Sequence, residues 1–317
     1  MNDLVTDVKS LELETLKNLK SSKALNTLRA YKADYKDFAA FCIKHGFKSM
    51  PSEPKIISLY LTHLSQTSKF STLKRRLASI SVIHKLSDHY IDTKHPMITE
   101  NLMGIKRVKG SYQKAKKPIL INELRKILNV IDEQNSPDIK KLRDKSIILI
   151  GFSGGFRRHE IISLDYEDLD FVYEGLKITV KRSKTDQFGE GTIKAWPYTK
   201  ESPYCPVTTL ERWLKISKIN KGPIFRRFSK GSNLSNNRLT DQSVAIIIKN
   251  YLNKAGIDSK NYSGHSLRSG FATTAAESGV EERTIMAMTG HKSTEMVRRY
   301  IKEANLFKNN ALHKIKI

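Results

Sequence analysis

Apolar residues recur every three or four positions along most of the chain, the spacing that places them on one face of an α-helix. The clearest early run ends at Gly46 and has Leu28, Tyr35 and Phe38 on its apolar face. Further helices are predicted to begin at Pro54, at Ser71 or Phe70, and at Pro96. We expect these helices, after a polar leader, to form one compact domain over residues 1–107.

The C-terminal part of the chain, residues 118–317, combines helical periods with one stretch of alternation. Leu176, Ile178 and Val180 alternate with polar residues, which is typical of a strand with one buried face. Residues 192–196 are predicted to form the returning strand. The expected fold class is therefore mainly α with a small antiparallel β-sheet: a helical N-terminal domain and a mixed α/β C-terminal domain.

A basic stretch without an apolar period, residues 108–117, separates the two parts and ends at Pro118. Such a sequence predicts a linker between domains. Its positive charge would also let it follow the backbone of a nucleic acid.

Composition narrows the class of protein. Lys and Arg number 56 against 32 Asp and Glu, which gives a net charge of +24 over 317 residues. A charge of this size, spread along the whole chain, favours a nucleic acid as the partner. The longest apolar run, residues 147–152, is too short to span a bilayer, and no signal peptide is visible. We expect no membrane association and a cytoplasmic location.

The two cysteines, Cys42 and Cys205, are far apart and lack the spacing of a zinc site or a disulfide framework. The acidic residues of segment 165–170 are spaced like a turn, so a magnesium site there is not favoured. We therefore expect neither a metal nor a cofactor.

Several residues suited to phosphate chemistry lie in unusual settings. Arg157 follows Gly154 and Gly155, which let the backbone approach a ligand closely, and Arg268 stands one helical turn after His265. Arginine stays charged and can donate two parallel hydrogen bonds to a phosphate. Metal-free cleavage of a phosphodiester also needs a nucleophile and an acid for the leaving oxygen.

At these positions the chain resembles the tyrosine recombinase, or phage integrase, family. The segment 155–164, Gly-Phe-Arg-Arg-His-Glu-Ile-Ile-Ser-Leu, is similar to the family's first arginine box. His265 and Arg268 match its H-x-x-R box, Gly290-His291 followed by Tyr300 matches its G-H…Y box, and Ser183-Lys184-Thr185 resembles its lysine hairpin. The resemblance also covers the N-terminal part, at segments 71–80 and 102–107. It implies a helical core-binding domain of the SAM-like type followed by the family's catalytic domain.

The resemblance implies a role for each of these residues. Tyr300 would attack phosphorus and form a 3′-phosphotyrosyl link. Arg157 and Arg268 would hold the non-bridging oxygens, and His291 would donate a further hydrogen bond to the phosphate. His265 would assist proton removal from Tyr300 or orient it. Lys184 would protonate the leaving 5′-oxygen, although a shift in alignment would give that role to Lys181 instead. Glu160 would support Arg157.

The expected partner is double-stranded DNA that carries a specific recombination site, bound by a homotetramer on two duplexes. Accessory DNA-bending proteins are a further partner that the resemblance allows. The predicted DNA-contacting residues are Lys74, Arg75, Arg76, Lys106, Arg107, Lys109, Lys114, Lys116 and Lys117. For the lysines and arginines on helices, a merely solvated face is the competing interpretation.

The resemblance implies a site-specific recombinase encoded by a bacterium, a phage or another mobile element. Two other functions are alternatives to it. A type IB topoisomerase-like enzyme would share the tyrosine nucleophile but relax supercoils, and the N-terminal domain of integrase type disfavours it. A catalytically silent DNA-binding relative would lack part of the residue set, which is complete here.

Overall fold

The computed structural model describes residues 25–110, 115–181, 191–199, 202–229 and 233–305, and single positions at residues 8, 10, 11, 14, 15, 312 and 315. Most of the predicted leader and most of the segment after residue 305 therefore lie outside the described residues. The chain divides into two compact units, Met1–Lys114 and Ala115–Ile317. Within the described part of the chain, no helix has the length and apolar character needed to cross a membrane.

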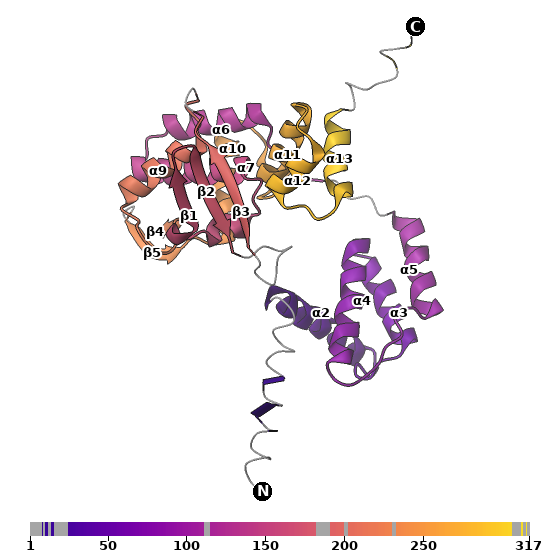
Figure 1. Ribbon diagram of the computed structural model, residues 1–317. Coiled ribbons are helices and arrows are strands. Elements are labelled where there is room, and N and C mark those ends of the chain that lie inside the picture. Colours follow the sequence, from indigo (N-terminus) through magenta and orange to yellow (C-terminus); the bar gives the residue numbers. More distant parts are fainter. Residues whose placement is uncertain are drawn as a thin grey trace. The chain divides into compact units, whose positions relative to one another are not determined.

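The first unit is helical (Figure 1). Its helices are α2 (Leu25–Lys44), α3 (Pro54–Ser65), α4 (Phe70–Lys85) and α5 (Pro96–Lys109). Proline begins α3 and α5, where its missing N–H costs nothing. The core contains Phe38, Tyr60, Leu73 and Ile80, which are buried and lie on the faces that the apolar spacing indicated. It also contains Leu61, which that spacing did not place inward.

Helix α5 continues two residues into the segment that the sequence predicted as linker. It ends at Lys109 because Gly110 adopts a left-handed backbone, with φ of 70°. The charged residues before Gly110 do not oppose a helix, since lysine and arginine are good helix formers.

The second unit carries a three-stranded antiparallel sheet and a two-stranded one. The strands are β1 (Leu169–Val172), β2 (Gly175–Val180), β3 (Thr192–Pro197), β4 (Arg226–Phe228) and β5 (Leu234–Arg238). The larger sheet has the order β1-β2-β3, so the predicted pairing of β2 with the returning strand is confirmed. The sequence did not predict β1 and β5, which are short and half-buried.

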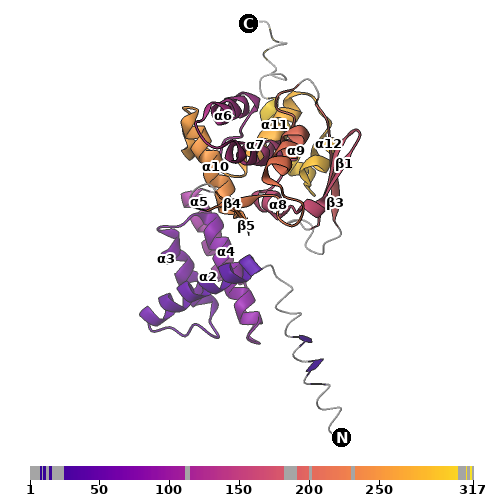
Figure 2. The ribbon, with the colours of Figure 1, turned by 90° about the vertical axis from the view of Figure 1, so that its left-hand side faces the viewer.

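Eight α-helices among the described residues accompany these sheets. They are α6 (Ile121–Glu133), α7 (Asp138–Ser153), α8 (Arg158–Ser163), α9 (Pro206–Ser217), α10 (Asp241–Lys254), α11 (Ser266–Glu277), α12 (Glu282–Thr289) and α13 (Thr294–Ala304). Figure 2 shows α7 and α9 next to each other inside the unit, where they bury much of the core. The expected class, mainly α with small antiparallel sheets, is confirmed.

The last three helices pack together and bring distant motifs close (Figure 1). Helix α11 also packs on α7, whose C-terminal end leads into the glycine turn before Arg157. Gly155 in this turn has φ of 54°, and an added Cβ would lie 2.8 Å from Cγ2 of Thr289. Glycine is therefore required where the turn meets the end of α12.

Candidate active site

Arg157 is held in place by Glu160, one turn further along the chain. Arg157 is the N-cap residue of α8, and its backbone N–H donates to Oε2 of Glu160 at 2.8 Å. Its guanidinium Nη1 donates to Oε1 of the same carboxylate at 2.7 Å. Glu160 is 3% exposed, so this ion pair is shielded from water. The pair therefore fixes the direction of the Arg157 guanidinium.

Arg268 is fully buried on α11, and this burial is unusual for a charged residue. Its Nη1 donates to the carbonyl of Gly155 at 2.8 Å and also to the carbonyl of Thr289. Its Nε and Nη2 have no hydrogen-bond partner among the described residues. Desolvation, with the nearby charge of Arg157, lowers the pKa of Arg268 to about 10. Two buried donors without a partner fit an anion that binds here.

His291 is also buried and lies next to Arg268 and Tyr300. Its Nδ1 is 2.7 Å from Oγ1 of Thr289, and the Thr289 hydroxyl is 2.6 Å from the carbonyl of Ile285. Because a carbonyl can only accept, the single hydroxyl proton points to Ile285, and Nδ1–H of His291 donates to Thr289. Its Nε2 has no hydrogen-bond partner within the described ranges.

Burial and the neighbouring positive charges keep His291 neutral. Desolvation is the main cause, followed by the charges of Arg268 and Arg157, and together they lower the pKa of His291 to about 4. With Nδ1 protonated, Nε2 of the neutral ring is an acceptor. It becomes a donor to an anion only when the ring gains a second proton, which a bound phosphate would favour by offsetting the arginine charges.

Tyr300 projects from α13 and packs on the small cluster around Ile285 and Val297. Its ring centroid lies 6.1 Å from that of His291. Burial raises the pKa of its hydroxyl, and the charge of Arg268 opposes that shift. Tyr300 and His265 both line a cavity of about 300 Å³.

His265 is the N-cap residue of α11 and remains exposed. Desolvation and the charges of Arg268 and Arg157 nevertheless lower its pKa. The imidazole is therefore neutral near pH 7 and can accept a proton. The structure thus brings together Arg157, Arg268, His291, His265 and Tyr300.

Lys184 lies outside the described residues. Lys181, the alternative in the same hairpin, is described. Its Nζ lies 2.6 Å from Oδ1 of Asp168, whose side chain is buried. This ion pair raises the pKa of Lys181, through its bond to Asp168. The ammonium of Lys181 therefore already has a carboxylate partner in its own unit.

Lys194 on β3 is a residue that the sequence reasoning missed. It is 8% exposed, and its Nζ donates to the carbonyl of Gly154 at 2.8 Å and to that of Met288 at 2.5 Å. The available signal was its alternation with Trp196, which places both residues on the inward face of the strand.

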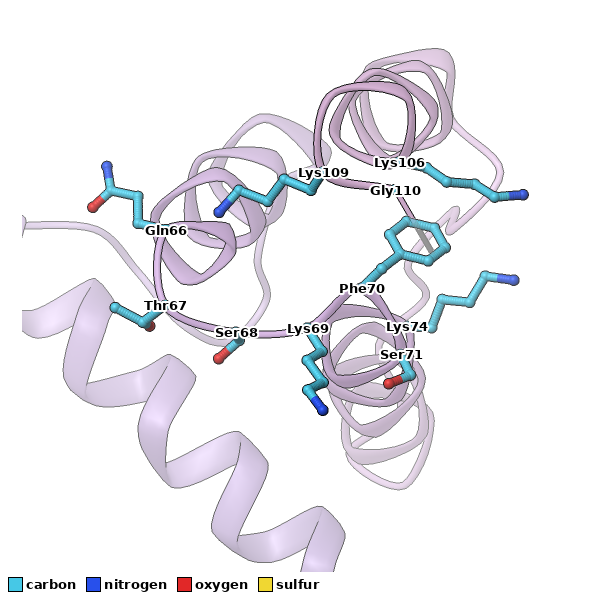
Figure 3. A pocket seen from close by; sticks show the side chains of 10 residues that line it. All are labelled: Gln66, Thr67, Ser68, Lys69, Phe70, Ser71, Lys74, Lys106, Lys109 and Gly110. Atoms are coloured by element: carbon cyan, nitrogen blue, oxygen red, sulfur yellow. The ribbon is translucent and has the colours of Figure 1, made fainter. Parts of the chain in front are cut away.

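The first unit presents a basic hollow of about 520 Å³ (Figure 3). The residues that line it are Gln66, Thr67, Ser68, Lys69, Phe70, Ser71, Lys74, Lys106, Lys109 and Gly110. Lys74 and Lys106 extend to the same side of it, and Nζ of Lys74 lies 5.6 Å from the ring centroid of Phe70. Lys69 was not among the predicted DNA-contacting residues. It belongs to the turn before α4, and the helical pattern gave no signal for it.

Arg75 and Arg76, which are predicted to contact DNA, both form ion pairs with Asp34 within the unit. Arg76 is 18% exposed and also pairs with Asp37 at 3.2 Å, so its guanidinium serves the packing of α4 on α2. Arg75 remains partly exposed. Asp34 is buried, and helical periodicity alone could not reveal this partner.

The remaining predicted contacts are spread over both units. Arg107 is exposed on α5, and Lys109 donates to the carbonyl of Ser65. Lys116 and Lys117 are exposed, with Lys116 donating to the carbonyl of Lys260. Lys114 lies outside the described residues. Among the residues that are described, no cluster of His, Cys, Asp and Glu could hold a metal ion.

Comparison with known proteins agrees with this arrangement. Residues 119–306 match the model of the phage integrase family. An integrase/recombinase XerD homolog of Selenomonas ruminantium is 40% identical over 317 residues, which cover 99% of this chain and 92% of that protein.

Two solved structures share the fold. The XerH site-specific recombinase bound to palindromic difH substrate aligns with a TM-score of 0.63 and 17% identity, over 84% of this chain and 72% of that one. A lambda integrase tetramer bound to a Holliday junction aligns with a TM-score of 0.59 and 17% identity, over 92% of this chain and 76% of that one.

The match over most of the second unit and the similarity over the whole chain define the class. The chain belongs to the phage integrase family, that is, to the tyrosine recombinases. It is accordingly an enzyme of DNA strand breakage and rejoining.

Proposed function

We propose that this chain is a site-specific DNA recombinase that cleaves DNA with Tyr300 and rejoins it through a 3′-phosphotyrosyl intermediate. The observation that carries this proposal is the set of buried donors beside Tyr300. Nε and Nη2 of Arg268 are donors that have no partner among the described residues. Nε2 of His291 also has no partner there, and it becomes a third donor when the ring is protonated beside a bound phosphate. Burying unpaired donors is costly, and a phosphodiester that enters the site would satisfy them.

The geometry supports a division of roles in the cleavage step. The hydroxyl oxygen of Tyr300 attacks phosphorus, the P–O5′ bond breaks, and the phosphate stays on the tyrosine. Neutral His265 accepts the phenol proton, since its lowered pKa leaves a lone pair free near pH 7. The leaving 5′-oxygen takes a proton from a general acid. Rejoining is the reverse, so neither ATP nor a metal is required.

Arg157 and Arg268 stabilise the negative charge of the transition state. Each is fixed before the substrate arrives, Arg157 by Glu160 and Arg268 by two carbonyls. Donors fixed in this way need no reorganisation during the reaction and are the most effective form of electrostatic catalysis.

Lys184 is our choice for the general acid. The pairing of Lys181 with buried Asp168 supports this, because an ammonium with a raised pKa that already binds a carboxylate is a poor proton donor. Lys184 follows Lys181 by three residues in the same hairpin and matches the family's lysine.

The proposed substrate is duplex DNA that carries a specific recombination site, and a homotetramer of this chain binds it. Accessory DNA-bending proteins are proposed as further partners. The proposed location is the cytoplasm. The XerH structure is named as a complex with difH DNA and the lambda integrase structure as a tetramer on a Holliday junction, which supports the DNA and the assembly. In the first unit, the lysine-lined hollow of Figure 3 supports contact with the DNA backbone.

The test has two stages. The DNA site is first recovered from a pool of randomised duplexes that the protein binds, and it is then remade with a nick beside the scissile phosphate so that cleavage cannot reverse. A covalent protein–DNA band that resists denaturant supports the proposal. Exchange between two duplexes that carry the site separates recombination from relaxation of supercoils alone.

A further inference from the structure

Strand β3 inverts the usual distribution of apolar and charged residues. Ile193 is 70% exposed, whereas its neighbour Lys194 is 8% exposed and points to the same interior as Trp196. A strand that followed only the hydrophobic effect would bury the isoleucine. Because a buried ammonium is unfavourable unless it is well paired, a specific interaction must hold Lys194 inside.

The partners of Lys194 are two backbone carbonyls from different segments of the site. Gly154 is the C-cap residue of α7, and Met288 lies in the last turn of α12. The Lys194 Nζ donates to both, at 2.8 Å and 2.5 Å. Helix C-termini carry unpaired carbonyls and a partial negative charge, so two of them together form a suitable site for a cation. The ring centroid of Phe156 lies 4.3 Å from Nζ, so the aromatic ring covers the charge.

These two carbonyls immediately precede the two that Arg268 binds. Lys194 binds Gly154 and Met288, and Arg268 binds Gly155 and Thr289. The two cations therefore link the same pair of backbone segments at adjacent residues. One segment leads into Arg157, and the other leads into His291.

We propose that Lys194 is a positioning residue, whose ammonium group sets the separation of the segments that carry Arg157 and His291 and so aligns both with the scissile phosphate. This inference rests on the proposed function. Lys194 is not a catalytic residue in this account, because its hydrogen bonds are directed to carbonyls of the protein. Its effect on the reaction passes through Arg157, Arg268 and His291.

The protonation state of Lys194 depends on opposing effects of burial and of the neighbouring charges. Four groups face the ammonium of Lys194. Glu160 on α8 favours its charged form, whereas Arg268 and Arg157 disfavour that form. His291 is the fourth group. Desolvation is the largest influence, and the pKa of Lys194 falls to about 8. The bridging ammonium is therefore charged below about pH 8 and becomes a neutral amine, with weaker hydrogen bonds, above it.

The test compares Lys194→Met with the matched control Lys177→Met, which removes an exposed lysine from the neighbouring strand β2. Both are assayed on the nicked duplex recovered from the randomised pool, at saturating DNA. We expect K194M to cleave about tenfold to hundredfold more slowly, as small misplacements of catalytic groups do, with unchanged DNA affinity. We expect K177M to match the wild type.

A second substrate separates positioning of the phosphate contacts from delivery of a proton. In it, sulfur replaces the bridging 5′-oxygen, so the leaving group is a thiolate that needs no general acid. K194M should remain slow on this substrate. Wild-type rates for K194M on the oxygen substrate would overturn the proposal, and so would full rescue by sulfur.

A third measurement needs no variant and so does not depend on the folding of K194M. The wild type is assayed on the sulfur substrate at limiting DNA, where the rate reports ionisations of the free protein. We expect the rate to fall above about pH 8, while K194R, which keeps its charge, falls only at higher pH. A wild-type rate that does not fall through about pH 9 would contradict the proposal. Absence of any covalent product with the wild type would instead refute the proposed function.

Discussion

The carboxylate of Glu160 accepts two hydrogen bonds from Arg157, one from its backbone N–H at 2.8 Å and one from Nη1 at 2.7 Å. One buried side chain thus fixes both the start of α8 and the direction of the guanidinium. Local structure and the active site depend on the same residue.

Glu160→Ala should therefore damage stability and cleavage together. Breaking a buried ion pair leaves an uncompensated charge and costs about 3–5 kcal/mol. Glu160→Gln keeps an acceptor oxygen and should lose less stability, but it leaves Arg157 without its counter-charge, so cleavage should still fall. Chemical unfolding and single-turnover cleavage of both variants check this. Equal stability of E160A and the wild type would contradict the structural role of the pair.

Arg268→Lys should be almost as inactive as Arg268→Ala. Lysine keeps the charge but lacks the planar fork that binds Gly155 and Thr289 on one side and offers Nε and Nη2 on the other. Loss of one fixed donor at a developing charge costs about 10²–10³-fold in rate. Single-turnover cleavage at saturating DNA measures it, with K177M as a control that leaves the site intact. A near-normal rate for R268K would show that charge alone is sufficient.

The two lysines of the β2–β3 hairpin should behave differently. Lys184→Ala should cleave the oxygen substrate slowly and recover on the substrate with bridging sulfur, since a thiolate leaves without a proton. Lys181→Ala should lose little cleavage, because Lys181 is paired with Asp168. The ratio of rates on the two substrates is the measurement. Sulfur rescue of K181A rather than K184A would transfer the role of general acid to Lys181.

Much of this arrangement could be predicted from the sequence, because local signals determine it. Apolar spacing located the helices, and alternation located the β2–β3 pair. The motif residues from Arg157 to Tyr300 were found because their spacing within each segment is short. Each of these signals depends only on residues that lie a few positions apart in the sequence.

Contacts between distant segments could not be predicted in this way. Nothing in the spacing of Arg76 shows that Asp34, on another helix, binds it. Lys194 follows the same pattern, since its partners come from the ends of α7 and α12. The direction in which a charged side chain points depends on which backbone groups the tertiary fold leaves without partners.

His84 should make the first unit sensitive to acid. The N–H of Ser52 donates to Nε2 of His84 at 3.1 Å, and Nδ1 lies 2.9 Å from the carbonyl of Ile80, so the buried ring must be neutral. Burial lowers its pKa in the folded protein. The unfolded chain therefore binds the proton more tightly, and stability present above about pH 6.5 is lost as the pH falls.

Hydrogen exchange of the amides in α4, corrected for the intrinsic effect of pH, measures this loss. His84→Gln can both donate and accept without titrating, so its protection should vary less with pH than that of the wild type. His63→Gln changes an exposed histidine of the same unit and serves as the control. Protection of α4 that stays constant in the wild type down to about pH 5 would contradict the account.

The most direct test of the central claim is covalent trapping of DNA by Tyr300. The wild type and Tyr300→Phe are incubated with the nicked duplex, denatured and separated by size. The wild type should yield a protein–DNA adduct whose digestion products carry DNA on the peptide with Tyr300, whereas Y300F should bind the same duplex and form none. An adduct of undiminished yield in Y300F, or DNA attached to another residue, would contradict the claim.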